Sequence, residues 1–420
     1  RFRVMPRALD QPMIDDIVQG YASAARRLHQ AGLDGVEVVA SHGYLPAQFL
    51  NPRVNLRSDG YNGDLDQRLR FLREVLAAVR AATDEQFIIG LRISADERDS
   101  QGLSEDESLA AAVALQGQLD YLHIVAGTSA SLGGAVHIVP PMAIEPAYLA
   151  REAGTFKQQL AIPLFVTGRI NQPQEAELIL ARGQADVCGM TRALICDPLM
   201  PSKAERGAVD DIRACIGCNQ ACIGHFHKGL PVSCIQHPET GRELRFDTLP
   251  AAARRKRVMV VGGGPAGMKA AAVAAARGHE VTLYEAEAQL GGQARLAQLL
   301  PRRAEFGGII TNLSREMELA QVRVRRGQRV DALGSLGDQL EVLDAVQDLH
   351  RCHAGEVEDE WHAELREGPD EDERSASEQS RGDDGQGHPR EPPPGRTAEV
   401  GRGLLHGRIH LRQRGGEVEV

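Results

Sequence analysis

Five short apolar runs alternate with helical patterns over the first 200 residues, and this alternation limits the fold more than any other feature. Helical periodicity spans residues 12–31 and returns at about 65–82, 104–116, 146–160 and 173–182, with a further helix from about Arg192. The apolar runs are Gly35–Ala40, Phe87–Ile93, Tyr121–Val125, Pro163–Thr167 and Asp186–Gly189. Strands that alternate with helices predict an α/β fold with a parallel sheet whose faces are covered.

Two kinds of parallel sheet fit this pattern. A (β/α)8 barrel has eight strands, so this chain would hold only the last five, and a first residue that is Arg1 rather than Met fits a fragment. An open doubly wound sheet of five strands is the alternative. The loops favour the barrel, because long Gly-rich segments at 41–64 and 126–145 follow strand ends, where barrel enzymes place their chemistry.

The last two predicted strands end in residues that suit a phosphate. Gly168-Arg169 follows the fourth strand, and Gly189-Met190-Thr191-Arg192 follows the fifth and opens a helix. Backbone N–H groups at a helix N-terminus and arginine side chains both bind phosphate oxygens. In a barrel these would be strands seven and eight, a frequent phosphate site, although each Gly-Arg pair alone also fits an ordinary turn.

Three more side chains near strand ends are candidates for contact with a ligand. His42 and Tyr44 follow the first strand, where a phenol can donate a proton and an imidazole can polarise an oxygen; an ordinary surface loop is the alternative. Arg92 interrupts the apolar run from Gly90 to Ile93. A buried guanidinium needs an anionic partner, so Arg92 predicts either a ligand anion or a structural carboxylate beside it.

Four cysteines, Cys215, Cys218, Cys222 and Cys234, have the spacing C-x2-C-x3-C-x11-C. Three close thiols and one remote thiol favour a 4Fe–4S cluster, whereas two close pairs would favour tetrahedral zinc. The nearby histidines at 225, 227 and 237 keep zinc open as an alternative, and unligated thiols are a third. Disulfides are not expected, because no secretory signal precedes the cysteines.

A nucleotide-binding pattern follows the cysteines. A strand at Val258–Val261 leads into Gly262-Gly263-Gly264-Pro265-Ala266-Gly267, then a helix of small residues, then a strand at Glu280–Tyr284 that ends at Glu285. Glycines in this spacing let a pyrophosphate approach the backbone, and the acid can bind ribose hydroxyls. The pattern predicts a dinucleotide or ADP on Gly262, Gly264, Gly267 and Glu285, with Gln293 near the same ligand.

Charge and hydropathy exclude other classes. The net charge of −10 gives little support to a nucleic-acid partner, and no apolar run is long enough to span a bilayer. We expect a cytoplasmic protein with a small-molecule substrate and no membrane partner; a homo-oligomer stays open.

Four segments are expected: part of a barrel at 1–205, a cluster segment at 206–250, a partial Rossmann-like domain at 251–332, and a tail at 333–420. The tail is rich in Glu, Asp, Arg, Gly, Ser and Pro and lacks sustained periodicity, which predicts disorder. An out-of-frame or misassembled end is our hypothesis for it. Sequencing the source DNA across codons 325–340 tests this hypothesis.

In combination, these stretches resemble the Old Yellow Enzyme-like NADH:flavin oxidoreductases with an iron–sulfur cluster, the group of 2,4-dienoyl-CoA reductase, trimethylamine dehydrogenase and histamine dehydrogenase. The strongest likeness is to the dimethylglycine and N-methylproline demethylase-like branch. The likeness covers residues 1 to about 332. The matching stretches are Asp34–Glu37, His42–Leu45, Gln48–Pro52, Arg68, Gly90–Arg92, Gly168-Arg169, Gly189–Arg192, Asp197-Pro198, the four cysteines and Gly262–Gly267.

The resemblance implies FMN at the barrel mouth, with Arg92 at the N1/O2 edge of the flavin. Gly168, Arg169, Gly189, Thr191 and Arg192 would lie near the phosphate. The four cysteines would hold a 4Fe–4S cluster that exchanges single electrons with FMN, and the Rossmann unit would hold FAD or ADP. Tyr44 would donate a proton to substrate and His42 would orient it.

Departures from the family pattern shape the expected function. Val39 stands where many relatives carry His or Tyr, and Thr128 stands where trimethylamine dehydrogenase-like members have an acid. The leading interpretation is oxidative N-demethylation of a small methylated amine. The alternatives are NAD(P)H-dependent reduction of an activated alkene such as a dienoyl-CoA, and an inactive fragment that binds only ADP or a metal.

Overall fold

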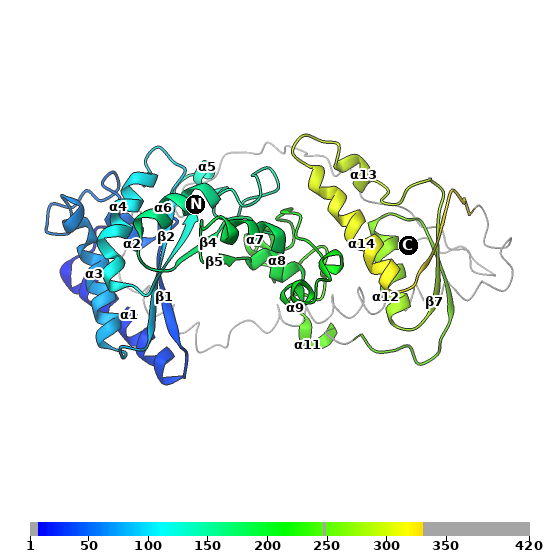
Figure 1. Cartoon of the computed structure of the whole chain (residues 1–420), viewed down its shortest axis with the longest axis horizontal. Helices are drawn as coiled ribbons and strands as arrows, with labels where there is room; N and C mark the ends of the chain where they lie inside the picture. Colours follow the sequence, from blue (N-terminus) through cyan, green and yellow to red (C-terminus); the bar gives the residue numbers. More distant parts are fainter. Residues whose placement is uncertain (1–6, 247–248, 331–420) are drawn as a thin grey trace, which may run out of the picture. The chain divides into compact units, whose positions relative to one another are not determined.

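The computed structural model describes residues 7–246 and 249–330, and the predicted tail at 333–420 lies outside the described residues. Two parallel sheets organise the described chain (Figure 1). The first has five strands: β1 (Gly35–Ala40), β2 (Ile88–Asp96), β3 (Tyr121–Ala126), β4 (Leu164–Thr167) and β5 (Val187–Gly189). The second has three: β6 (Arg257–Val261), β7 (Glu280–Glu285) and β8 (Arg323–Arg326). The expected α/β class is confirmed.

The order of the strands in the first sheet distinguishes the two kinds of fold that the sequence left open, a barrel and an open doubly wound sheet. The five strands lie in the order β1-β2-β3-β4-β5, and every neighbouring pair is parallel. A doubly wound sheet reverses its order at a switch point, whereas a (β/α)8 barrel adds each strand beside the one before it. The observed order therefore favours the barrel alternative.

Helices connect the strands and cover the first sheet. They are α1 (Gln11–Gln30), α2 (Leu45–Leu50), α3 (Leu65–Ala81), α4 (Glu105–Leu115), α5 (Leu132–Ala135), α6 (Ala150–Gln159), α7 (Pro173–Ala181), α8 (Thr191–Cys196) and α9 (Met200–Glu205). Side-chain caps fix several starts, since Asp64 and Ser104 each form a capping box at the N-terminus of α3 and α4. The helix predicted at 146–160 begins only at Ala150, because Ala147 takes a left-handed φ of 51° that a helix does not allow.

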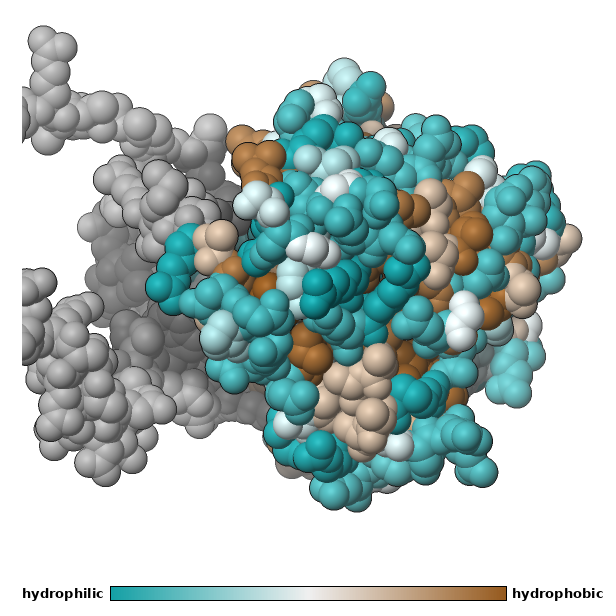
Figure 2. All heavy atoms as spheres, turned by 90° about the vertical axis from the view of Figure 1, so that its left-hand side faces the viewer, coloured by the Kyte–Doolittle hydropathy of each residue, from teal (hydrophilic) through white to brown (hydrophobic). Residues whose placement is uncertain are grey.

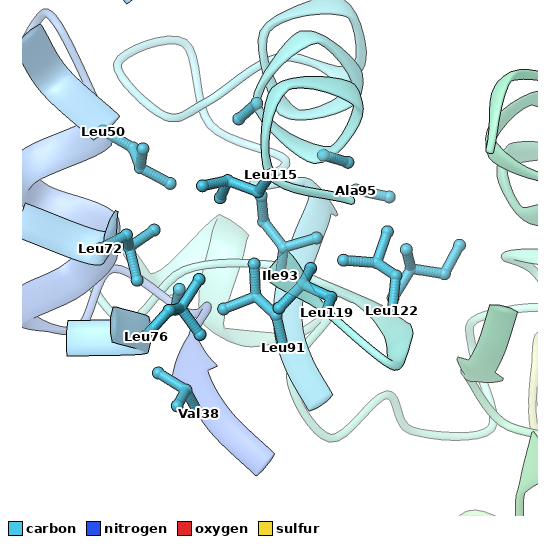
Figure 3. Close-up of a cluster of buried hydrophobic side chains, with 14 of the residues drawn as sticks. Val38, Leu50, Leu72, Leu76, Leu91, Ile93, Ala95, Leu115, Leu119 and Leu122 are labelled. Carbon is cyan, nitrogen blue, oxygen red and sulfur yellow. The ribbon is translucent and has the colours of Figure 1, made fainter. Parts of the chain in front are cut away.

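The core lies between the first sheet and its helices. Leu72 and Leu76 of α3 and Leu91 and Ile93 of β2 are almost fully buried, and Figure 3 shows them gathered with Leu115 and Leu122. Burial of each such side chain stabilises the fold by roughly 1.5–3 kcal/mol relative to leaving it exposed. Figure 2, which faces the end of the molecule that carries α1 and α3, shows a mostly hydrophilic surface, as these amphipathic helices require.

The second sheet has its own core. Val258 and Leu283 pack with Met268 of α12 (Pro265–Ala276) and Leu313 and Met317 of α14 (Gly307–Leu319). The strand order β6-β7-β8 follows the first half of a Rossmann fold, and the register pairs Val258 with Val281. The short helices α10 (Ile223–Phe226), α11 (Glu243–Phe246) and α13 (Ala294–Ala297) lie in the connecting segments. Among the residues placed in the structure, no helix is long and apolar enough to cross a bilayer.

Candidate functional site

A cavity of about 260 Å³ lies where the strands of the first sheet end. Its walls come from the loops after β1, β3, β4 and β5 and from Arg92 inside β2. Seven of the residues predicted from the sequence line it: His42, Arg92, Gly168, Arg169, Gly189, Thr191 and Arg192. Tyr44 is not among the lining residues; its side chain is half exposed, with its ring centroid 6.2 Å from that of His42.

His42 is fixed at the edge of this cavity. It takes a φ of 60°, its amide donates to Ser94 Oγ at 3.0 Å, and its carbonyl accepts from the amide of Ser129 at 2.9 Å. Nδ1 lies 3.3 Å from the carbonyl oxygen of Gly127, which only accepts, so Nδ1 carries the proton and Nε2 is an acceptor. Burial lowers the pKa of His42, and the bond to Gly127 offsets only part of this effect. The imidazole is therefore neutral at pH 7.

Arg92 has the carboxylate partner that was one of its two predicted alternatives, and a ligand anion beside it stays a prediction. Its Nη2 lies 2.6 Å from Oε1 of Glu37, which is the carboxylate partner, and the side chain also lines the cavity. Its Nε is buried without a hydrogen-bond partner. A buried donor left without a partner costs about 1–3 kcal/mol, so a ligand acceptor would stabilise this site.

Arg169, which was predicted to bind a phosphate, already has protein partners for most of its guanidinium group. Its side chain is fully buried, Nη1 bonds to the carbonyl of Ile144, and Nη2 pairs with Glu305. Only Nε has no partner. A phosphate would have to compete with Glu305 for this guanidinium, so Arg169 is a weaker phosphate ligand than the sequence indicates.

Gly189 and Arg192 come from the end of β5 and the start of α8 and line the same cavity. A Cβ at Gly189 would stand 1.8 Å from Oγ1 of Thr167, so only glycine fits beside that hydroxyl. Helix α8 is six residues long and contributes little dipole, so positive charge at this wall comes mainly from Arg192. Nη1 of Arg192 donates to the carbonyl of Pro140 at 2.8 Å and to Oδ1 of Asn219 at 2.7 Å.

Sequence reasoning missed three polar residues of this cavity, His137, Thr167 and Asn171. His137 lies in the Gly-rich loop at 126–145, whose length was the available signal. Thr167 is the last residue of a predicted strand, and a hydroxyl at that position could have been singled out. Asn171 gave no separate signal.

A second, small cavity gathers the predicted metal ligands. Cys215, Cys218, Cys222 and Cys234 line it, together with a fifth cysteine, Cys196, and mostly apolar side chains. Within residues 7–246 and 249–330, no three His, Cys, Asp or Glu side chains come close enough to hold one metal ion. His225 and His227 do not line this cavity, which gives no support to a zinc site built with them.

The thiols lie in a setting that disfavours uncompensated negative charge. Burial raises the pKa of Cys215, and it raises the pKa of Cys218 to about 11. A hydrogen bond with Cys196 lowers the pKa of Cys234 to about 6 and raises that of Cys196. Thiolates at Cys215 and Cys218 therefore need a bound cation to be stable at neutral pH.

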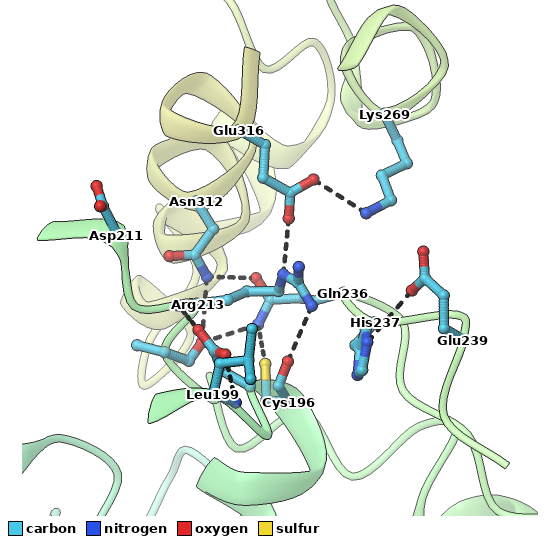
Figure 4. A network of polar contacts seen from close by, with 12 residues as sticks. Cys196, Leu199, Asp211, Arg213, Gln236, His237, Glu239, Lys269, Asn312 and Glu316 are labelled. Atoms are coloured by element: carbon cyan, nitrogen blue, oxygen red, sulfur yellow. Dashed lines mark hydrogen bonds and ion pairs between the residues drawn. The ribbon is translucent and has the colours of Figure 1, made fainter. Parts of the chain in front are cut away.

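Gln236 forms hydrogen bonds that join the segment before Cys215 to Cys196 and to helix α14 (Figure 4). Its Nε2 donates to the carbonyl of Ala214 at 2.9 Å and to Sγ of Cys196 at 3.5 Å, and its Oε1 accepts from Asn312 of α14 at 2.6 Å. Beside it, Arg213 Nε lies 2.6 Å from Glu316, which also pairs with Lys269 at 2.9 Å. The segment on either side of Cys215 is thus tied to α12 and α14.

The glycine-rich loop has the shape that its pattern predicts. A Cβ at Gly267 would stand 2.0 Å from the carbonyl oxygen of Gly262, so glycine permits close contact between helix α12 and strand β6. At Gly264 no atom lies within 4 Å of such a Cβ. Oε2 of Glu285 accepts from the amide of Gly263 at 2.6 Å, and Gly291 donates to the carbonyl of Gly263 at 2.7 Å. Gln293 is exposed at the start of α13.

Comparison with known proteins agrees with this arrangement. Residues 2–211 match the NADH:flavin oxidoreductase / NADH oxidase family, and residues 260–320 match the NAD(P)-binding Rossmann-like domain. The N,N-dimethylglycine/sarcosine dehydrogenase of Chromohalobacter salexigens is 38% identical over 330 residues, which cover 77% of this chain and 47% of that protein. The chain thus spans about half the length of the curated relatives it matches.

Two solved structures share the fold over most of this chain. A 2-naphthoyl-CoA reductase is 30% identical with a TM-score of 0.73, covering 77% of this chain and 49% of its own. Histamine dehydrogenase from Rhizobium sp. 4-9 is 28% identical with a TM-score of 0.74, covering 80% and 49%. With the family match over residues 2–211 and these likenesses, the chain belongs to the NADH:flavin oxidoreductase / NADH oxidase family.

Proposed function

We propose that this chain is part of an FMN- and 4Fe–4S-dependent oxidoreductase that oxidises a small methylated amine with loss of an N-methyl group. The observation that carries the proposal is Arg192, which lines both the cavity at the strand ends and the cysteine cavity. A flavin and a cluster on either side of one residue would be close enough for electron transfer.

The residues of the first cavity fit a flavin mononucleotide. Arg92 and Arg169 each leave a buried Nε without a protein partner, and Arg192 adds a third cation to the same walls. Cations suit both the phosphate and the pyrimidine edge of FMN, which accepts hydrogen bonds and gains negative charge on reduction. Gly168 and Gly189 also line this cavity, and since they carry no side chain, their backbone forms that part of its wall. Arg169 would contribute chiefly through Nε.

The cysteine cavity fits a 4Fe–4S cluster better than a single ion. Four thiols line one largely apolar space, yet among the described residues no three ligands converge on a point. A cluster takes one thiolate at each of four separate irons, so its ligands stand further apart than those of zinc. Cys215, Cys218, Cys222 and Cys234 would supply these thiolates, and the charge of Arg192 would stabilise them.

FMN held by these residues would supply hydride chemistry towards the substrate and single-electron exchange with a neighbouring cluster. The protein residues prepare the substrate for this chemistry. His42 is neutral and presents Nε2 as an acceptor, so it can take a hydrogen bond or a proton from an ammonium substrate. Arg92 holds positive charge beside the ring site.

The Rossmann-type unit would bind FAD or ADP on its glycine loop. The free space at Gly264 and the close contact at Gly267 both suit a pyrophosphate at the start of α12. Glu285, whose Oε2 already accepts from Gly263, would bind the ribose through its remaining lone pairs. A further NAD(P)H or protein redox partner and a homo-oligomer remain predictions.

Reduction of an activated alkene is the second candidate, and the likeness to a 2-naphthoyl-CoA reductase favours it. The position of Tyr44 speaks against it, since the proposed proton donor is half exposed and outside the cavity lining. The likeness to N,N-dimethylglycine/sarcosine dehydrogenase favours a methylated amine as the substrate.

Anaerobic reduction of the flavin separates these two functions. We expect N,N-dimethylglycine or sarcosine to bleach the flavin absorbance and to release formaldehyde, and NADPH to be slower. Rapid bleaching by NADPH, with no reaction of either amine, would instead establish the reductase. A chain that contains no flavin and no iron would leave the third interpretation, an inactive fragment.

A further inference from the structure

A continuous chain of hydrogen bonds runs inside the first sheet, below the proposed flavin cavity. Arg92 Nη2 lies 2.6 Å from Oε1 of Glu37, and Oε2 of Glu37 lies 2.9 Å from Nδ1 of His123. Nε2 of His123 lies 2.8 Å from Oγ1 of Thr167. Arg92 and Thr167 both line the cavity, so the chain begins and ends at its walls.

Sheet topology places these residues together. Strands β1, β2 and β3 are neighbours, and the register pairs Arg92 with His123 and Val39, two residues beyond Glu37. Residues two apart on a strand face the same side of a sheet. Glu37, Arg92 and His123 therefore point to one side, although 86 residues separate the first from the last.

Glu37 is the centre of the chain. Its side chain is only 17% exposed, and a carboxylate in such a place is costly unless it is paired. It has three donors, since the hydroxyl of Tyr121 also donates to Oε2 at 3.0 Å. Burial opposes ionisation, but His123, Arg92 and Tyr121 together lower the pKa of Glu37 below its ordinary value. The carboxylate is thus ionised and holds Arg92 by charge as well as by geometry.

We propose that Glu37 and His123 are positioning residues for the proposed flavin site. Glu37 fixes the guanidinium of Arg92 so that its unpaired Nε stays at the cavity, and it balances the charge of Arg92. His123 joins Glu37 to Thr167, whose hydroxyl lies against Gly189. This inference rests on the proposal that the cavity binds FMN.

Two substitutions at Glu37 separate charge from geometry. Glu37→Gln keeps the size and one acceptor oxygen but removes the negative charge, so Arg92 becomes an uncompensated cation. A reduced flavin carries negative charge at its pyrimidine edge, and we expect the flavin midpoint potential to rise. Glu37→Ala frees Arg92 altogether, and we expect the FMN dissociation constant to rise roughly tenfold, the effect of about 1.4 kcal/mol.

The test uses the full chain reconstituted with FMN, with flavin fluorescence for affinity and spectroelectrochemistry for potential. Glu74→Gln is the matched control, because Glu74 pairs with Arg70, accepts from the hydroxyl of Tyr61 and does not line the cavity. Circular dichroism checks that each variant is folded. If Glu37→Ala is unfolded, the FMN affinity and midpoint potential of Glu37→Gln alone test the positioning role.

The outcomes are distinct. A higher flavin midpoint potential in Glu37→Gln, with no such rise in Glu74→Gln, supports the positioning role, whereas a lower potential in Glu37→Gln contradicts it. If the unmodified chain binds FMN and Glu37→Gln leaves both affinity and potential unchanged, the inference is wrong while the proposed function stands. If the unmodified chain binds no FMN, the proposed function and this inference both fail.

Discussion

Arg192 donates a 2.7 Å hydrogen bond from Nη1 to Oδ1 of Asn219, and this bond joins the wall of the strand-end cavity to the cysteine loop. Asn219 lies between Cys218 and Cys222 with a φ of 57°, and its Nδ2 donates to the carbonyl of Val139 at 2.7 Å. One side chain therefore fixes the loop against both the helix α8 and the segment at 139–140. Electron transfer between the two proposed cofactors would depend on this alignment.

Substitutions at Asn219 should measure what this bond contributes. We expect Asn219→Gly to lose about 2 kcal/mol of unfolding free energy, because a hydrogen bond to a charged group is removed. Asn219→Ala should lose about 1 kcal/mol more, because alanine is strained at a positive φ. Urea denaturation provides both values. A glycine variant as stable as the unmodified chain would mean that the bond contributes nothing.

The cysteine variants test the identity of the metal centre. Replacing Cys215 or Cys234 by Ser should reduce iron and acid-labile sulfide from about four per chain to near zero. Cys188→Ser is the control, because Cys188 lies in β5 outside the cysteine cavity, and its Sγ donates a weak hydrogen bond to the carbonyl of Ala176 at 3.8 Å. Iron and sulfide analysis of the three variants is the measurement. One zinc per chain, lost in the same variants, would refute the cluster.

A pair of glycine variants separates packing from ligand binding at the nucleotide loop. Gly267→Ala places a Cβ 2.0 Å from the carbonyl of Gly262 and should cost about 1–3 kcal/mol, as overpacking does. Gly264→Ala meets no protein atom within 4 Å, so stability should hold while ADP binding weakens. Thermal unfolding and calorimetric titration with ADP report the two effects. Unaltered ADP affinity in Gly264→Ala would place the nucleotide elsewhere.

The lowered pKa of His42 predicts that the free energy of unfolding depends on pH. Folding lowers its pKa, so below the ordinary value near 6.5 the unfolded chain binds more protons than the folded chain. The free energy of unfolding should therefore fall as the pH falls from 7 towards the folded pKa. His42→Asn removes this contribution, and asparagine tolerates the φ of 60°.

The comparison is made with urea denaturation at pH 7.5 and pH 5.5. His137 and His279 also have pKa values lowered by burial, but they titrate in both proteins, so the difference between the two curves isolates His42. Parallel curves over this range would show that the imidazole of His42 titrates normally when the chain is folded.

Local patterns predicted the elements near the site well. The apolar run Gly35–Ala40 has the bounds of β1, and the helix predicted at 65–82 is α3 within one residue. Such runs reveal themselves because burial imposes a regular spacing of apolar residues. Helix α14 escaped notice, since it starts at Gly307-Gly308 and has no side-chain cap.

Contacts between residues that lie far apart in the chain could not be predicted from the sequence. The partner of Arg92 could be predicted only as an anion, because the strand register that brings Glu37 to it is a property of the folded sheet. Glu305, whose carboxylate pairs with the guanidinium of Arg169, lies 136 residues after Arg169 in the chain. The four cysteines were singled out because their close spacing is typical of metal ligands, whereas Cys196 lies 19 residues before Cys215 and carries no such pattern.

The most direct test of the proposed cofactors is an anaerobic visible spectrum of the purified chain, with iron, sulfide and zinc analysis of the same sample. We expect flavin bands, a broad iron–sulfur absorbance, and about four irons and four sulfides per chain. Zinc in place of iron, with no sulfide and no flavin, would contradict both the cluster and the electron-transfer function.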